Sequence, residues 1–277
     1  MLHRSRGIAY KRRQVTATMR YAEMNWPDIE ALDRDTLLLL TVSPMEEHGP
    51  HLPVGTDLFV AQAVEERIMV SLEGEHPMVA LPPLPLGTCR MAADFPGSLS
   101  LPWKVVRDVV GHTLESLAGQ GFTRAMLLTF HMDLHHVKAL HAAMARIRRS
   151  GLTACEPLSA YYFRGILLPP VDGETEVHAD LRETSLALVL FPELVHGHEH
   201  LTPVHIHMDG PSALFKTMKE MGAERGYVGD PSRASREYGQ RCLEQVTQVC
   251  VQAARALLAG EEIPRLPSRI RLLLRLI

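Results

Sequence analysis

The sequence predicts a single α/β domain in which helices flank a mostly parallel central β-sheet. Short apolar runs alternate along the chain with longer stretches whose apolar residues recur about every 3.6 positions, as strands and helices alternate in βαβ units. The apolar runs carry no charged residue, which is typical of parallel strands buried on both faces. The chain has 277 residues, 46% of them hydrophobic, without an internal repeat or a low-complexity linker. It is therefore long enough for one sizeable core.

The expected strands are the four apolar runs, at residues 36–43, 78–81, 125–130 and 152–155. The helical periodicity between and after them predicts helices over residues 61–72, 103–117 and 136–149. A later helix is expected to begin near Asp230-Pro231, because Asp is a favourable N-cap and Pro fits the first helical turn.

Both ends of the chain depart from this pattern. Residues 1–20 form a basic arm that lacks the apolar segment of a signal peptide. Residues 264–277 interleave four arginines with Ile and Leu. This favours a terminal element that docks on the domain or on a neighbouring subunit over a segment that lies on a membrane. The single domain is therefore expected to span residues 21–263.

The amino-acid composition excludes several classes of function and favours one. The 29 Lys and Arg residues against 32 Asp and Glu give a net charge of −3, so no nucleic-acid surface is expected, and no apolar run is long enough to span a membrane. The four cysteines lie far apart without a CxxC pair. This argues against a disulfide framework and a thiolate zinc site, and favours a reducing compartment, the cytoplasm. Fourteen of the 15 histidines fall between His48 and His207, which indicates metal or acid–base chemistry.

A polar loop follows the expected strand 36–43, and ligands of open α/β sheets bind at the carboxyl ends of strands. Glu46 and His48 are two positions apart, so an extended backbone points both side chains to one side, and Asp57 follows after a Pro- and Gly-rich turn. Imidazole and carboxylate ligands suit zinc, manganese or iron, and Asp can bridge two ions. From this loop alone, ordinary polar residues remain an equal alternative.

Two further segments offer the same ligand types. His131 and Asp133 follow the expected strand 125–130 directly. His131 and His135 also have the spacing of a zinc-binding helix, but the preceding apolar strand and the missing Glu disfavour that reading. Further along, His178 lies in a loop and Glu183 opens an apolar helix that could face the same crevice. The sequence therefore predicts a metal site where these segments meet.

The run EEHGPHLPVGTD at residues 46–57 resembles the E-x-H-G-x-H-L-P-x-x-T-D signature of the creatininase (creatinine amidohydrolase) family. Weaker matches are NWP at residues 25–27 and FPGS at residues 95–98, where the family has F-P-G-T. The resemblance implies a creatininase-like α/β sandwich and a hydrolytic centre with two divalent metal ions per chain. Zinc is the first expectation for these ions, with manganese or iron as alternatives. It also implies a homo-oligomer, commonly a hexamer.

Carried over by position, the resemblance implies that Glu46, His48, Asp57 and His131 are metal ligands, with Asp57 bridging. The last ligand stays open. Creatininase itself uses a Glu two residues after the histidine, where this chain has Asp133, while other members use the Glu of E-T-S, which is Glu183 here.

The chain also departs from the family pattern. It has TFHMDL where the family has N-G-H-G-G-N, and HADL where the family has H-A-G-E, so bulk replaces small residues that face the substrate. We therefore expect the chemistry to be retained on a small molecule other than creatinine. The predicted activity is a metal-dependent amidohydrolase that cleaves a C–N bond of a cyclic or linear amide with a metal-activated water. His178 is the expected general acid, and Asp133 the base or proton relay if it is not a ligand.

Three alternatives remain at this point. A ring-opening hydrolase of keto-sugar or inosose-type substrates would share the metal centre. A non-catalytic binding or scaffold protein would keep the fold while Phe130, Met132 and Leu181 fill the former pocket. A cysteine nucleophile is the third, because Cys89 lies in a loop with Gly, Thr and Arg, although no histidine motif adjoins it in sequence.

Overall fold

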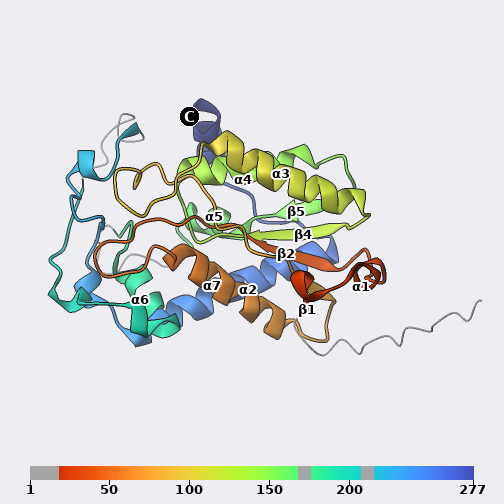
Figure 1. The fold of residues 1–277 in the computed structure, drawn as a ribbon, viewed down its shortest axis with the longest axis horizontal. Helices are drawn as coiled ribbons and strands as arrows, with labels where there is room; N and C mark the ends of the chain where they lie inside the picture. The colour runs from red at the N-terminus through yellow and green to blue at the C-terminus, as the bar shows by residue number, and fades with distance from the viewer. Residues whose placement is uncertain (1–18, 168–175, 207–214) are drawn as a thin grey trace, which may run out of the picture.

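A central five-stranded parallel β-sheet organises the chain (Figure 1), which a computed structural model describes at residues 19–167, 176–206 and 215–277. The strand order is β1-β3-β2-β4-β5, and every pair is parallel. The strands are β1 (Met19–Arg20), β2 (Leu37–Thr41), β3 (Met78–Ala80), β4 (Arg124–Leu128) and β5 (Thr153–Cys155). The predicted α/β class and the four predicted strands are confirmed.

Strand β1 was not predicted, because two residues carry no periodic pattern. It pairs with β3 through Met19 and Arg20, at the end of the expected basic arm. Residues 1–18 of that arm lie outside the described residues.

The α-helices are α1 (Trp26–Glu30), α2 (Thr56–Ser71), α3 (Trp103–Gly119), α4 (Leu134–Arg146), α5 (Pro157–Tyr162), α6 (Leu181–Leu190), α7 (Arg236–Ala259) and α8 (Ser268–Leu276). Short 3₁₀ helices lie at Tyr21–Glu23, Pro192–Leu194, His198–His200, Lys219–Met221 and Pro231–Arg233. Helix α2 begins earlier than predicted, so that Asp57 lies in its first turn.

The start predicted for the late helix near Asp230 was wrong. The Asp230 side chain accepts a hydrogen bond from the backbone N–H of Ser232 and so caps the short 3₁₀ helix instead. Helix α7 begins at Arg236, because the Ser235 side chain accepts from the N–H of Tyr238 and supplies the N-cap.

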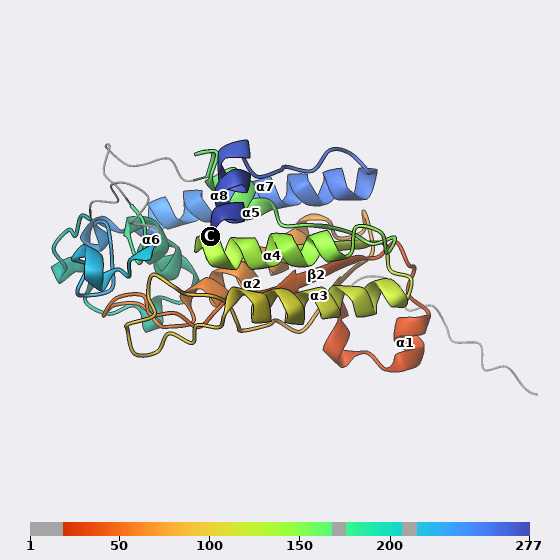
Figure 2. The ribbon, with the colours of Figure 1, turned by 90° about the horizontal axis from the view of Figure 1, so that it is seen from above.

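Helices cover both faces of the sheet. The leucines of β2 alternate between two core clusters, with Leu37 and Leu39 in one and Leu38 and Leu40 in the other. Helices α2 and α7 pack on the first face and α3 and α4 on the second, where they lie side by side (Figure 2). Buried strand side chains on both faces explain why the predicted strands read as continuous apolar runs.

The segment at residues 264–277 docks on the domain. Leu266 and Leu274 are buried against Val137 of α4, and the ammonium of Lys138 donates a hydrogen bond to the carbonyl oxygen of Ile277. Among the described residues, no helix has both the length and the apolar character that a membrane crossing requires.

The strand order places a crevice beside β2. From β2 the chain passes through α2 to β3 on one side, and from β3 it passes through α3 to β4 on the other side of β2. Helices α2 and α4, which follow β2 and β4, lie on opposite faces, so the connections diverge at the carboxyl ends of these two strands. This is where open α/β sheets bind ligands.

Candidate metal centre

Five side chains converge at this edge of the sheet. Glu46 and His48 lie in the loop after β2, Asp57 in the first turn of α2, His131 after β4, and Glu183 in the first turn of α6. The first four are at most 5% exposed, and the Glu183 side chain is largely buried. The structure thus brings together the residues that the sequence singled out in three separate segments.

Asp57 lies between two groups of ligand atoms. Its Oδ2 lies 3.1 Å from Nδ1 of His131, which is 2.9 Å from Oε2 of Glu46. Its Oδ1 lies 3.4 Å from Nε2 of His48, which is 3.7 Å from Oε2 of Glu183. We call the Glu46 and His131 side of Asp57 position A, and the His48 and Glu183 side position B.

Backbone carbonyls fix how the two imidazoles face Asp57. Nδ1–H of His48 donates to the carbonyl oxygen of Glu46 across 3.0 Å, and Nε2–H of His131 donates to that of Thr88 across 2.9 Å. A carbonyl can only accept, so each of these nitrogens carries the proton. The other nitrogen of each ring is left to face the carboxylates, which is how proteins orient metal-binding histidines.

Three of these side-chain atoms have no hydrogen-bond partner in the part of the chain that the structure describes. Oε2 of Glu46, Nε2 of His48 and Oδ2 of Asp57 have no hydrogen-bond partner among the described residues, although all three are buried. Leaving buried polar atoms unsatisfied is costly, and a cation would satisfy all three. The oxygen and nitrogen donors also suit a divalent ion such as zinc or manganese, so the residues present fit a pair of metal ions.

The electrostatics of the cluster favour cations. Burial opposes a charge on His48, but Asp57 and then Glu183 and Glu46 outweigh it and raise the pKa of His48 to about 10. The pKa of His131 is likewise raised well above its usual value, against burial, chiefly by Glu46. The pKa of Asp57 is held far below its usual range, against burial, by His48 and His131, whereas burial raises that of Glu183 to about 7. Without metal, protons therefore take the place of cations.

The loop after β2 is braced against α6. Gly49 has φ +65°, and a Cβ there would lie 2.9 Å from Nδ1 of His51, so glycine is required. Nε2 of His51 is 2.8 Å from the hydroxyl of Thr184, next to Glu183. Burial, followed by the nearby His198 and His48, lowers the pKa of His51 to about 3, so the ring is neutral. His51 therefore ties this loop to the helix that carries Glu183.

Asp133 has a different environment from the five clustered residues. Its carboxylate accepts backbone N–H groups from His135 at 2.7 Å, His136 at 3.4 Å and Arg90 at 2.9 Å, and it is the N-cap of α4. Burial opposes ionisation, but hydrogen bonds from His135 and the charge of His131 lower the pKa of Asp133 to about 2. Its oxygens are therefore committed to the backbone.

His178 lies beside position B. Its Nε2–H donates to the carbonyl oxygen of Glu47 across 2.8 Å, and its ring centroid is 4.5 Å from that of His48. The next residue, Ala179, has φ +46°, a left-handed conformation that costs energy for a residue with a Cβ. Glu47 is itself buried, and burial raises its pKa.

A cavity of about 140 Å³ opens beside the centre. Its polar wall includes Glu46, Asp57, His131, His178 and Glu183. The rest of the lining is mainly apolar and includes Met91, Phe130, Met132, Leu134, Leu158, Tyr162, Leu167, Val177 and Met218. Phe130 and Met132 therefore line the cavity without closing it. Leu181 is buried and is not among the described residues that line the cavity.

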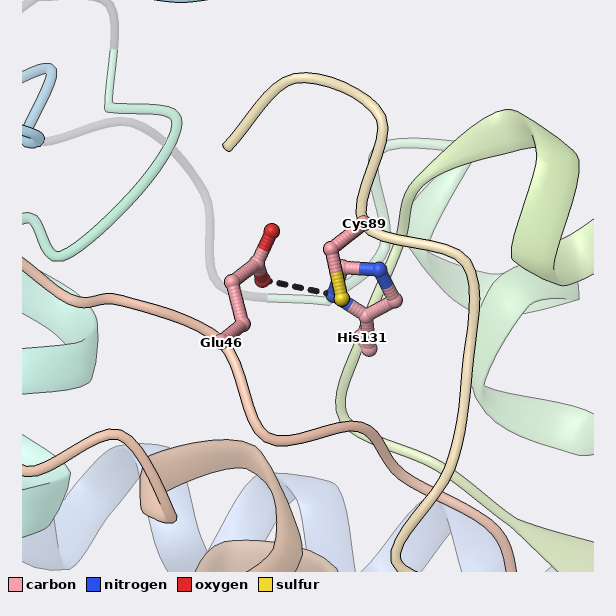
Figure 3. A group of neighbouring side chains, drawn as sticks. All are labelled: Glu46, Cys89 and His131. Atoms are coloured by element: carbon pink, nitrogen blue, oxygen red, sulfur yellow. Dashed lines mark ion pairs between the residues drawn. The ribbon is translucent and has the colours of Figure 1, made fainter. Parts of the chain in front are cut away.

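Cys89 is a neighbour that the sequence did not assign to the metal site. Its thiol projects from the β3–α3 connection toward Glu46 and His131 (Figure 3). Sγ, a carboxylate oxygen of Glu46 and a ring nitrogen of His131 all lie within 4.8 Å of one another. Cys89 is fully buried, burial raises the pKa of its thiol to about 11, and the described cavity lining does not include it. A nucleophile would need access and a low pKa, so this geometry disfavours that role.

Comparison with known proteins gives consistent matches. A family model described as creatinine amidohydrolase matches residues 22–254. The chain is 26% identical over 254 residues to the creatinine amidohydrolase of Pseudomonas putida, covering 83% of this chain and 92% of that protein. It is 27% identical over 226 residues to the mycofactocin precursor peptide peptidase of Mycolicibacterium smegmatis, covering 77% of this chain and 82% of that protein.

Solved structures agree in fold. A crystal structure of creatinine amidohydrolase has a TM-score of 0.71 and 25% identity, covering 87% of this chain and 98% of the solved chain. A second structure, described as creatininase with Mn, has a TM-score of 0.70 and 25% identity, covering 86% of this chain and 98% of the solved one. The fold implied by the sequence resemblance is therefore confirmed.

Proposed function

The chain belongs to the creatininase family and is a hydrolase of that family; from this premise we propose that it is a metal-dependent amidohydrolase that cleaves a C–N bond of a cyclic or linear amide. The observation that carries the proposal is the position of Asp57, whose two oxygens face two histidines on opposite sides. A carboxylate so placed can bridge two ions, and an open cavity reaches it.

We propose two divalent ions per chain, zinc first, with manganese or iron as alternatives. Glu46, His131 and Asp57 would hold one ion at position A, and His48, Asp57 and Glu183 the other at position B. One similar solved structure is creatininase with manganese, which supports that alternative. When bound, such a pair of ions polarises a carbonyl and activates water at neutral pH.

The departing nitrogen of the cleaved amide needs a proton, which a residue of the chain would supply. We assign this role to His178, which lines the cavity and is oriented by the carbonyl oxygen of Glu47. In this proposal Glu183 is the last ligand, because it faces His48 while Asp133 is bound to three backbone N–H groups. Asp133 then holds the start of α4, which follows His131 directly.

The cavity wall indicates the kind of amide. Met91, Phe130, Met132, Leu158 and Met218 present hydrocarbon and thioether surface beside the polar centre. An apolar substituent next to the scissile bond would bury itself there, whereas a creatinine ring or a polyhydroxylated keto-sugar would gain less from contact with this apolar part of the wall. We therefore favour an amide with an apolar side chain, such as a short peptide, over both. The open cavity favours an enzyme over the scaffold alternative.

We also propose where the protein resides in the cell and how it assembles. All four cysteines are free and buried, which supports a reducing compartment such as the cytoplasm. We also propose a homo-oligomer, which by family resemblance is a hexamer.

The test combines metal analysis with substrate screening. Purified protein is expected to carry two zinc, manganese or iron ions per chain and to hydrolyse N-acyl amides or peptides with apolar side chains faster than creatinine. Removal of the metal should abolish turnover, and re-addition should restore it. Less than one ion per chain after incubation with excess zinc would refute the proposal.

A further inference from the structure

The thiol of Cys89 completes a donor group at position A. Sγ lies with a carboxylate oxygen of Glu46 and a ring nitrogen of His131 within 4.8 Å (Figure 3). In a zinc site with four protein donors, bonds of about 2.0 Å to nitrogen or oxygen and about 2.3 Å to sulfur leave the sulfur about 3.5 Å from the other donor atoms. A side-chain movement of at most about 1.3 Å would therefore bring the thiol into bonding distance.

A second observation, the hydrogen bonding of these donor atoms, supports a role in binding a cation. Oε2 of Glu46, which is 2% exposed, has no hydrogen-bond partner among the described residues. It lies 2.9 Å from Nδ1 of His131, the nitrogen that the Thr88 contact leaves without a proton in the neutral ring. Oδ2 of Asp57 is unpartnered in the same way, 3.1 Å from that nitrogen. Two buried oxygens and a nitrogen thus converge beside the thiol.

The segment around Cys89 is held in place at three successive residues. The carbonyl oxygen of Thr88 accepts Nε2–H of His131, and the N–H of Arg90 donates to Oδ2 of Asp133. The N–H of Cys89 itself donates to the hydroxyl of Ser100 across 3.0 Å. The backbone that carries the thiol is therefore held beside His131, and a preorganised backbone lowers the conformational entropy lost on binding.

We propose, on the basis of the proposed function, that the Cys89 thiolate is a ligand of the ion at position A and makes this position selective for a soft divalent cation such as zinc. Position A would then have four protein donors, from Glu46, Asp57, His131 and Cys89, which is the number that structural zinc sites use. Position B keeps three, from His48, Asp57 and Glu183, which leaves room for water or substrate. The two ions therefore differ in donor softness and in access.

The experiment uses cobalt as the probe, because thiolate bound to Co²⁺ gives a sulfur-to-metal charge-transfer band in the near ultraviolet. Full-length protein is stripped of metal and titrated with Co²⁺, while bound cobalt and the spectrum are recorded together. The expected result is two cobalt ions per chain and a charge-transfer band that reaches its full intensity after one equivalent. Manganese, which prefers oxygen ligands, should compete poorly for that equivalent.

The variant Cys89→Ser should still bind two ions, lose the band and bind zinc at one position at least about tenfold more weakly, with little change for manganese. Cys250→Ala is the matched control, because Cys250 is equally buried but lies in α7, within the core. It should keep the band.

The possible outcomes distinguish failure of the Cys89 ligand role from failure of the proposed two-metal hydrolase. Two cobalt ions per chain without a band in the wild type would overturn the role of Cys89 and leave the two-metal hydrolase standing. Retention of the band in Cys89→Ser would overturn it as well. Less than one cobalt ion per chain would refute the metal centre itself. The wild-type spectrum decides the question even if Cys89→Ser fails to fold.

Discussion

Oδ2 of Asp57 lies 3.1 Å from Nδ1 of His131, and both side chains are almost completely removed from solvent. The other oxygen of the same carboxylate faces His48 across 3.4 Å. Asp57 therefore lies between positions A and B, and its position in the first turn of α2 fixes it relative to the sheet.

We expect Asp57→Asn to lose both ions, because an amide presents one oxygen and no charge to two cations that need the carboxylate bridge. Metal analysis after incubation with excess zinc should fall from two ions per chain to less than one. Asp35→Asn, a change at an exposed carboxylate, should keep both ions. Two ions in Asp57→Asn would contradict the bridging role.

Glu183→Gln and Asp133→Asn should differ sharply, because both carboxylates line the cavity but only Glu183 faces His48. We expect Glu183→Gln to lose the ion at position B and keep about one per chain. Asp133→Asn should keep two, since its carboxylate serves backbone N–H groups. It should cost about 1 kcal/mol of stability, because an amide has one oxygen where Asp133 uses one for the N–H of His135 and the other for that of Arg90. Metal analysis and urea unfolding measure both effects. The reverse pattern would make Asp133 the ligand.

The sequence was sufficient for most of the fold because the signals were local. A charge-free run such as residues 36–43 can only be a buried strand or helix, and its length between turn residues favours a strand. Strand β1 could not be found, since two residues have no pattern and its pairing with β3 depends on a distant segment. The early start of α2 was missed because residues 53–57 have the composition of a turn.

The site was less predictable where contacts are long-range. Glu46, His48 and Asp57 share one motif, so their grouping followed from the sequence. The choice between Asp133 and Glu183 did not, because each lies near a histidine, and only the backbone contacts of Asp133 distinguish them. The sequence offers Cys89 as one of four scattered cysteines and as a possible nucleophile, but not as a metal ligand. Its contact with His131 depends on the β3–α3 connection, for which the sequence has no motif.

Zinc binding should release protons. The pKa of His48 is raised to about 10 without metal, so the ring is protonated at neutral pH and must lose that proton before Nε2 can bind an ion. Apparent affinity should therefore rise with pH across the neutral range. Calorimetric titrations with zinc at pH 7 in buffers of different ionisation enthalpy should report the release of at least about one proton per chain. Release of none would mean that His48 binds no metal.

His178→Gln should slow turnover while metal content stays at two ions per chain. The glutamine amide can still donate to the carbonyl oxygen of Glu47, so the local fold is kept, but it cannot deliver a proton. We expect kcat on the amide found by screening to fall by at least about 100-fold with a small change in KM. His112→Gln, at an exposed position on α3, is the control. A fall in kcat of less than about threefold would exclude His178 as the acid.

Glu65 should make the protein less stable as pH rises. It is buried on α2, and burial raises its pKa to about 7 even though the hydroxyl of Thr41 donates to Oε2 across 2.8 Å. Because the folded pKa lies above the unfolded value, the ionised form is penalised in the folded state. The cost is absent below pH 4.5, grows as pH rises from 4.5 to 7, and levels off above pH 7 at about 3 kcal/mol.

Glu65→Gln keeps an acceptor for Thr41 and removes this cost, so it should stabilise the protein above pH 8 and have little effect at pH 4.5. The measurement is the free energy of unfolding in urea at several pH values, compared with wild type at each pH. Glu66→Gln, at the next residue, changes an exposed carboxylate paired with Arg20 and should shift stability by less than about 1 kcal/mol without a pH trend. If Glu65→Gln gave the same difference from wild type at both ends of the pH range, the ionised carboxylate would not be the source of the destabilisation.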